Sequence, residues 1–107
     1  MTTFDKREDS FENKFAHDEE LRFKAEARRA RLLGLWAAEK LGKTGADAEA
    51  YARAIVVADV AASGGDDVFR KIRADFDGAG VDQSDHRIRR TMEELMARAV
   101  AEIQAGL

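Results

Sequence analysis

Residues 82–103, DQSDHRIRRTMEELMARAVAEI, hold the most regular apolar pattern of the chain. The apolar side chains recur every three or four residues, at Ile88, Met92, Leu95, Met96, Ala99 and Ile103. Side chains with this spacing share one face of an α-helix. Asp82 or Ser84 precedes the pattern and is the kind of residue that caps a helix N-terminus. The stretch predicts an amphipathic helix whose apolar face packs against other helices.

Two long helical segments are expected earlier in the chain. The first spans residues 18–41 and ends at Gly42, a residue favoured after a helix C-terminus. Its recurring apolar side chains are Leu21, Ala25, Leu32, Leu35 and Trp36. The second follows Thr44, a good N-cap residue, and ends at residues 63–65, SGG. Its apolar side is formed by Ala48, Tyr51, Ala52, Ile55, Val56 and Ala62.

A shorter helix lies between these segments and the last one. Asp66 is its expected cap, and residues 77–80, DGAG, are expected to break it. Its apolar face consists of Val68, Phe69, Ile72 and Phe76. Connections of a few residues favour packed, roughly antiparallel neighbours. The sequence therefore predicts an all-α fold in which residues 18–107 form a four-helix bundle.

The composition fits one small helical domain and excludes several classes of protein. The 107 residues include no proline and no cysteine, so neither disulfides nor thiolate metal sites are expected. The net charge is -3, from 18 basic and 21 acidic residues, whereas nucleic-acid-binding proteins usually carry a basic excess. We see no run of about 20 apolar residues that could span a bilayer and no signal-peptide pattern. These observations predict a cytoplasmic protein that binds no nucleic acid and inserts into no membrane.

Residues 1–17 differ from the rest because they are polar with three large exceptions. On a helix, Phe4, Phe11 and Phe15 fall within about 40° of one another and form a narrow aromatic stripe. Burying the three rings contributes at most about 9 kcal/mol, whereas ordering each residue costs about 1–2 kcal/mol in backbone entropy. We therefore expect a flexible N-terminal arm that becomes helical only against a partner surface.

Two loops match ligand-binding motifs only in part. Residues 75–80, DFDGAG, match the start of a calcium-binding EF-hand loop. Ala79 and His86 stand where an oxygen ligand and a bidentate Glu are needed, so a helix end followed by a turn is favoured. Residues 63–67, SGGDD, lead from glycines into acids, whereas a phosphate-binding loop leads into Lys and Ser or Thr. This second loop is interpreted as a turn between helices.

The remaining candidate functional residues are two single histidines and one basic run. His86 is interpreted as a surface residue, while His17 lies beside the aromatic stripe and could change charge within the physiological pH range. The run Arg28-Arg29-Ala30-Arg31 is interpreted as a solvated helix face near Lys24 and Glu26, and the alternative is a contact with an anion or a partner. No Ser-His-Asp or Cys-His set is present, so we predict that the protein is not an enzyme.

Residues 11–38 are the most specific part of the sequence, with FENKFAHDEELRFKAEARR at 11–29 and LLGLWAA at 32–38. This stretch closely resembles the zeta subunit family, the small inhibitor proteins of alphaproteobacterial rotary ATP synthases. The similarity extends over essentially the whole chain, through Tyr51, residues 65–68 and 70–71, and the apolar pattern of 92–103. One departure is Ala30, where the family commonly has Asn, and it weakens the case for a polar contact there.

The resemblance implies that the arm enters a catalytic α/β interface of the synthase head as a helix and blocks rotation in the hydrolytic direction. The partners would be the alpha, beta and gamma subunits of the head, much as for the mitochondrial inhibitor protein. The protein would then be peripheral to the inner membrane through the synthase. Carried over to this sequence, the three aromatic anchors and their polar neighbours are Phe4, Glu8, Phe11, Glu12, Lys14, Phe15 and His17.

Two other functions stay open. One is a nucleotide-sensing regulator, because a nucleotide site has been proposed for the family, although this sequence has no phosphate loop. The other is a helical adaptor for an unrelated partner. No cofactor is expected beyond weak binding of ATP or ADP. A monomer is expected because the apolar faces are used within one bundle.

Overall fold

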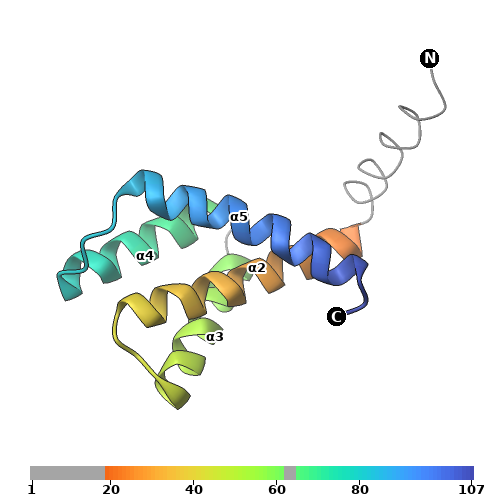
Figure 1. Cartoon of the computed structure of the whole chain (residues 1–107). Helices are drawn as coiled ribbons and strands as arrows, with labels where there is room; N and C mark the ends of the chain where they lie inside the picture. Colours follow the sequence, from red (N-terminus) through yellow and green to blue (C-terminus); the bar gives the residue numbers. More distant parts are fainter. Residues whose placement is uncertain (1–18, 62–64) are drawn as a thin grey trace.

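A computed structural model describes residues 19–61 and 65–107. Within these ranges the chain forms four helices and no strand: α2 (Glu19–Lys40), α3 (Gly45–Ala61), α4 (Gly65–Ala79) and α5 (Asp85–Gln104). Helix α2 makes its most extensive contacts with α3 and α5, and α4 packs against α3 and α5 (Figure 1). The predicted all-α fold with four helices is confirmed. The predicted boundary between an arm at 1–17 and a bundle at 18–107 lies outside the described residues.

Two glycines end helices with the same hydrogen-bond pattern. Gly42 has φ +77°, and the amides of Gly42 and Lys43 donate to the carbonyls of Glu39 and Ala38. Gly80 has φ +70°, and the amides of Gly80 and Val81 donate to the carbonyls of Asp77 and Phe76 at the end of α4. These are Schellman ends, in which a residue in the left-handed region turns the chain out of the helix.

Helix α4 differs from the prediction at both ends. It begins at Gly65, so Asp66 lies in its first turn rather than at its cap. It continues through Asp77 and Gly78 and ends at Ala79, so the expected break at residues 77–80 was placed too early. The reason is physical, because only Gly80 adopts the left-handed φ that stops the helix. For α5, the sequence left Asp82 and Ser84 as alternative N-cap residues. Ser84 is the N-cap, since its Oγ accepts a hydrogen bond from the amide of Arg87 at 3.0 Å.

The core lies where all four helices meet. Its largest fully buried side chains are Phe76, Leu33, Ile55, Ile72, Ile88 and Val68. The predicted apolar face of α4 is buried as a whole, and Phe76 meets Trp36 of α2 edge to face with ring centroids 5.7 Å apart. This aromatic pair ties α4 to α2 across the core.

The buried face of α2 was predicted only in part. Apart from Leu33, its buried residues are small: Ala25, Ala30, Gly34, Ala37 and Ala38. Leu32, Leu35 and Trp36 are only partly buried. Small residues let neighbouring helices approach closely, and a Cβ added at Gly34 would lie 2.7 Å from the Cα of Ala52 on α3. Helix α2 therefore packs through small side chains and Leu33, while its other large apolar side chains are only partly buried.

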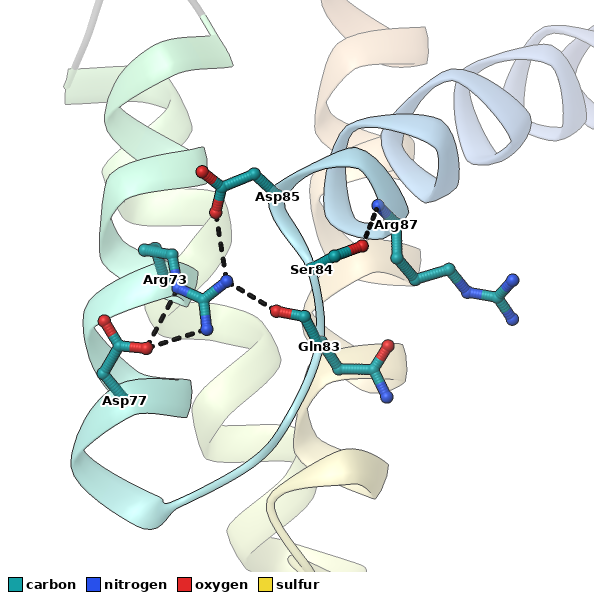
Figure 2. A network of polar contacts seen from close by, with 6 residues as sticks. All are labelled: Arg73, Asp77, Gln83, Ser84, Asp85 and Arg87. Atoms are coloured by element: carbon teal, nitrogen blue, oxygen red, sulfur yellow. Dashed lines mark hydrogen bonds and ion pairs between the residues drawn. The ribbon is translucent and has the colours of Figure 1, made fainter.

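A network around Arg73 holds the connection between α4 and α5 (Figure 2). Its guanidinium donates to Asp77 at 2.8 Å, to Asp85 at 3.0 Å and to the backbone carbonyl of Gln83. The hydrogen bonds that Arg73 donates to the two carboxylates raise its pKa. Because the network joins the last turn of α4 to the first turn of α5, it fixes the angle at which the two helices leave their loop.

Candidate functional site

The residues predicted to bind a partner lie outside the part of the chain that the structure describes. They are Phe4, Glu8, Phe11, Glu12, Lys14, Phe15 and His17. The structure does describe the point at which this segment joins the bundle. Glu19 is the first residue of α2, so anything bound by residues 1–17 is connected to the helix that makes the most extensive contacts with the other helices.

The start of α2 and the end of α5 lie together at one end of the bundle (Figure 1). Arg28 joins them, since its Nη2 donates to the backbone carbonyl of Leu107 at 2.6 Å and its Nη1 lies 3.5 Å from Glu102. Both side chains of this ion pair are about three-quarters buried, because Arg28 is 30% exposed and Glu102 is 25% exposed. The arm is therefore attached beside the carboxyl end of the chain.

Arg29 and Arg31 clamp α2 to α3. Arg29 lies 3.5 Å from Asp59, and their side chains are only 18% and 9% exposed. Arg31 donates to Glu49 at 2.8 Å, and this hydrogen bond lowers the pKa of the carboxyl. The expected local pairing of the basic run is therefore wrong, because all three arginines reach across to another helix.

Asp59 is held in an unfavourable setting for a carboxylate. Burial raises its pKa, Glu26 raises it further, and Arg29 works in the opposite direction. The sequence analysis missed this residue. The available signal was its isolation, since Asp59 is the one acid in the apolar run IVVADVAA at 55–62. A lone acid in such a run indicates a buried partner.

A second polar cluster surrounds Tyr51 at the other end of α3. Its hydroxyl donates to Asp75 at 2.7 Å, and Lys71 lies 3.3 Å from the same carboxylate. The ammonium groups of Lys43 and Lys71 lie 5.9 and 5.8 Å from the centroid of the Tyr51 ring. Burial, followed by the hydrogen bond to Asp75, raises the pKa of the phenol. An open groove runs beside this cluster and is lined by Leu41, Lys43, Tyr51, Lys71, Ala74, Asp75, Gly78 and Ala79.

The EF-hand-like aspartates are used within the bundle. Asp75 pairs with Tyr51 and Lys71, while Asp77 pairs with Arg73. Within residues 19–61 and 65–107, no three His, Cys, Asp or Glu side chains come together as they would around a metal ion. Over the same residues, no helix combines the length and apolar character needed to cross a membrane. Ala30, the departure from the family pattern, is 1% exposed in the core and needs no polar partner there.

Comparison with known proteins gives the family. The model of the family described as ATPase inhibitor subunit zeta matches residues 1–102. The chain belongs to this family. The match includes the arm as well as the bundle, so the predicted resemblance is confirmed over nearly the whole chain. As a zeta-family member the protein is an inhibitor subunit of an ATPase, which is a regulatory role.

A solved structure supports the zeta-family fold. A protein whose structure was determined by NMR in solution is 46% identical to this chain, with a TM-score of 0.71. The match covers 81% of this chain and 99% of that one. No curated protein matches the chain.

Proposed function

We propose that this zeta-family protein inhibits ATP hydrolysis by the F-type ATP synthase by inserting residues 1–17 as a helix into a catalytic α/β interface. The observation that carries the proposal is the family match, which spans the arm and the bundle as one unit. The partners are the alpha, beta and gamma subunits of the catalytic head. The protein is then cytoplasmic and peripheral to the inner membrane through the synthase.

Coupled folding and binding is the proposed mechanism. Phe4, Phe11 and Phe15 lie on one face of the helix that residues 1–17 would form, and they supply its apolar anchors. A segment of this kind orders only when a partner buries its rings, so much of the interaction energy offsets the cost of ordering. Glu8, Glu12, Lys14 and His17 add the polar contacts at the rim of the interface.

The bundle supports this mechanism as an anchor for the arm. Helix α2 follows the arm directly and is clamped to α3 by Arg29 and Arg31 and to α5 by Arg28. A helix held on two sides resists reorientation when a segment joined to its first turn is bound elsewhere. In this mechanism the bundle stays outside the interface and limits how far the arm enters.

The experiment measures ATP hydrolysis by the purified synthase head with increasing amounts of inhibitor. Four proteins are compared: the full chain, the chain lacking residues 1–17, the triple variant F4A/F11A/F15A, and the control S10A. On a helix, Ser10 would lie about 120° from the middle of the aromatic stripe, so its loss should leave inhibition unchanged. We expect the deletion and the triple variant to lose inhibition by at least about 100-fold, since each anchor contributes roughly 1.5–3 kcal/mol. Equal inhibition by the full chain and the deleted chain would refute the arm mechanism.

A nucleotide-sensing role is the second candidate, and the groove beside Tyr51 favours it. The ammonium groups of Lys43 and Lys71, which lie over the Tyr51 ring, bring two positive charges together that could pair with the phosphates of a nucleotide. Titration with ATP or ADP while amide chemical shifts are recorded tests this role. Shifts confined to residues around Tyr51 would support it, and the absence of any localised shift at millimolar nucleotide would remove it.

A further inference from the structure

The large apolar side chains left exposed by the bundle gather in the half that carries the arm. Among the described residues they are Phe23, Val57, Val60 and Leu107, with exposed fractions of 58, 66, 57 and 76%. Phe23 lies one turn into α2, Leu107 lies beside Arg28, and the two valines lie in the last turns of α3. Arg29 contacts Asp59 near the end of α3, whereas Gly34, later in α2, lies against Ala52, earlier in α3. The two helices therefore run antiparallel, and the last turns of α3 lie against the first half of α2.

The opposite half of the bundle contrasts with this arrangement. There the large apolar side chains of Leu41, Tyr51 and Val81 are packed against the core and are partly buried. The outer face of α3 in that half carries only small apolar residues, of which Ala46 and Ala50 are exposed. Exposed apolar residues scattered singly over a surface need no explanation, but these four all lie in one half of the bundle, which makes that half a candidate interaction surface.

One member of this set, Leu107, lines a groove. The other apolar lining residues are Val56 of α3 and Ala27 and Leu32 of α2, and the charged ones are Arg28, Arg31 and Glu102. Arg28 is paired with Glu102, and Arg31 is paired with Glu49. The groove therefore offers apolar area with little unpaired charge, which suits an apolar protein surface better than a charged ligand.

We propose that the arm-proximal apolar surface, formed by Phe23, Val57, Val60 and Leu107, is a second contact of the inhibitor with the same partner that receives the arm. The inference rests on the proposed function. The occupant is an apolar patch on the synthase head beside the entrance to the arm's cleft. Continuity supports this choice, because α2 begins at Glu19 and Phe23 follows one turn later. Any partner that holds residues 1–17 is thereby brought against this end of the bundle.

Binding of the full chain to the purified head tests the surface. The variant V57Q/V60Q removes two exposed apolar side chains that lie about 40 residues away from the arm in sequence. The control A46Q/A50Q places the same side chain at two exposed positions on the same helix in the other half. Gln is a good helix former, so circular dichroism should show both variants folded.

We expect V57Q/V60Q to weaken binding by at least about 10-fold, which corresponds to about 1.4 kcal/mol. The control should bind like the unaltered chain. Binding of V57Q/V60Q as tight as that of the unaltered chain would overturn the proposal. Sedimentation supplies a further check, since a dimer of the unaltered chain that V57Q/V60Q converts to a monomer would assign the surface to a second copy instead.

The outcomes separate this proposal from the arm mechanism. Loss of binding by V57Q/V60Q with unchanged inhibition on deletion of residues 1–17 would support the surface and refute the arm. Unchanged binding by V57Q/V60Q, together with loss of inhibition on deletion of residues 1–17, would support the arm and refute the surface. Failure of the unaltered chain to bind the head would overturn both, since the surface is assigned to that partner.

Discussion

Replacing Gly34 by alanine tests how closely α2 and α3 approach each other. A Cβ at this position would lie 2.7 Å from the Cα of Ala52 and 3.2 Å from the Cβ of Ile55. Carbon atoms in contact are normally about 3.5–4.0 Å apart, so the backbone of α3 would have to move by about 1 Å. A flexible side chain could rotate away, but a backbone atom moves only with its helix.

The expected magnitude follows from two opposing effects. In an exposed helix, Gly→Ala stabilises by about 1 kcal/mol because glycine has a low helix propensity. Forcing an extra methyl group into a packed core costs about 1–3 kcal/mol. At Gly34 the second effect should prevail, because the displaced atom belongs to a backbone that Arg29 and Arg31 also hold in place. We therefore expect a cost in the upper part of that range, about 2–3 kcal/mol, which leaves a net loss of about 1–2 kcal/mol.

Thermal unfolding followed by circular dichroism measures the change. A loss of this size lowers the midpoint by about 5–15 °C in a domain of about 100 residues. Gly78→Ala is the matched control, since Gly78 lies within α4 and a Cβ there would meet no atom within 4 Å. That variant should gain up to about 1 kcal/mol. If G34A were as stable as the unaltered chain, the close packing of α2 on α3 would be refuted.

Three further substitutions test the polar contacts. Arg29→Met leaves the Asp59 carboxylate without its partner, so the unfolding free energy at pH 7 should fall by about 1–3 kcal/mol. Burial holds the pKa of Asp59 above its ordinary value, so as the pH falls the folded protein binds a proton there before the unfolded chain does. In urea titrations, the stability lost by Arg29→Met should therefore shrink as the pH falls through the folded-state pKa of Asp59. A loss of stability that does not depend on pH would count against a buried carboxylate. Tyr51→Phe removes the hydrogen bond to Asp75 and should cost about 1 kcal/mol at pH 7. Burial also raises the pKa of this phenol, so the unaltered chain should lose stability as the pH rises through about 10, where the unfolded phenol ionises, and the Phe variant should be spared that loss. Ser84→Ala removes the N-cap of α5 and should lower the unfolding free energy by about 1 kcal/mol, whereas an unchanged urea midpoint would show that the cap is not used.

Helical spacing predicted the elements that have clear apolar faces. The apolar face of α4 was predictable because large apolar residues at helical spacing are usually buried. The Ser84 cap of α5 was predictable because a short polar side chain just before such a pattern usually caps the helix. The buried face of α2 was harder to predict, since Ala25, Ala30 and Gly34 carry little apolar signal. Their burial depends on how closely two other helices approach, which the sequence of α2 alone does not contain.

The charged contacts show a similar division. The sequence around Arg28, Arg29 and Arg31 favours local pairs, because residues three or four apart on a helix are always within reach. The actual partners are 18 to 79 residues away and become neighbours only after the helices pack. The arm residues, by contrast, were identified by resemblance to a family, and the physical pattern supplied their shared face and the reason that they need a partner.

The bond between Arg28 and the carbonyl of Leu107 has a practical consequence for handling the protein. An affinity tag or fluorophore attached to the carboxyl end would begin beside the root of the arm, where it could obstruct the partner under study. The turn at Asp82, which is exposed and lies at the end of α4 near Gly80, is a better place for a label. A dye at this turn and another on the arm would report their separation by energy transfer, free and bound, while the carboxyl end stays unlabelled.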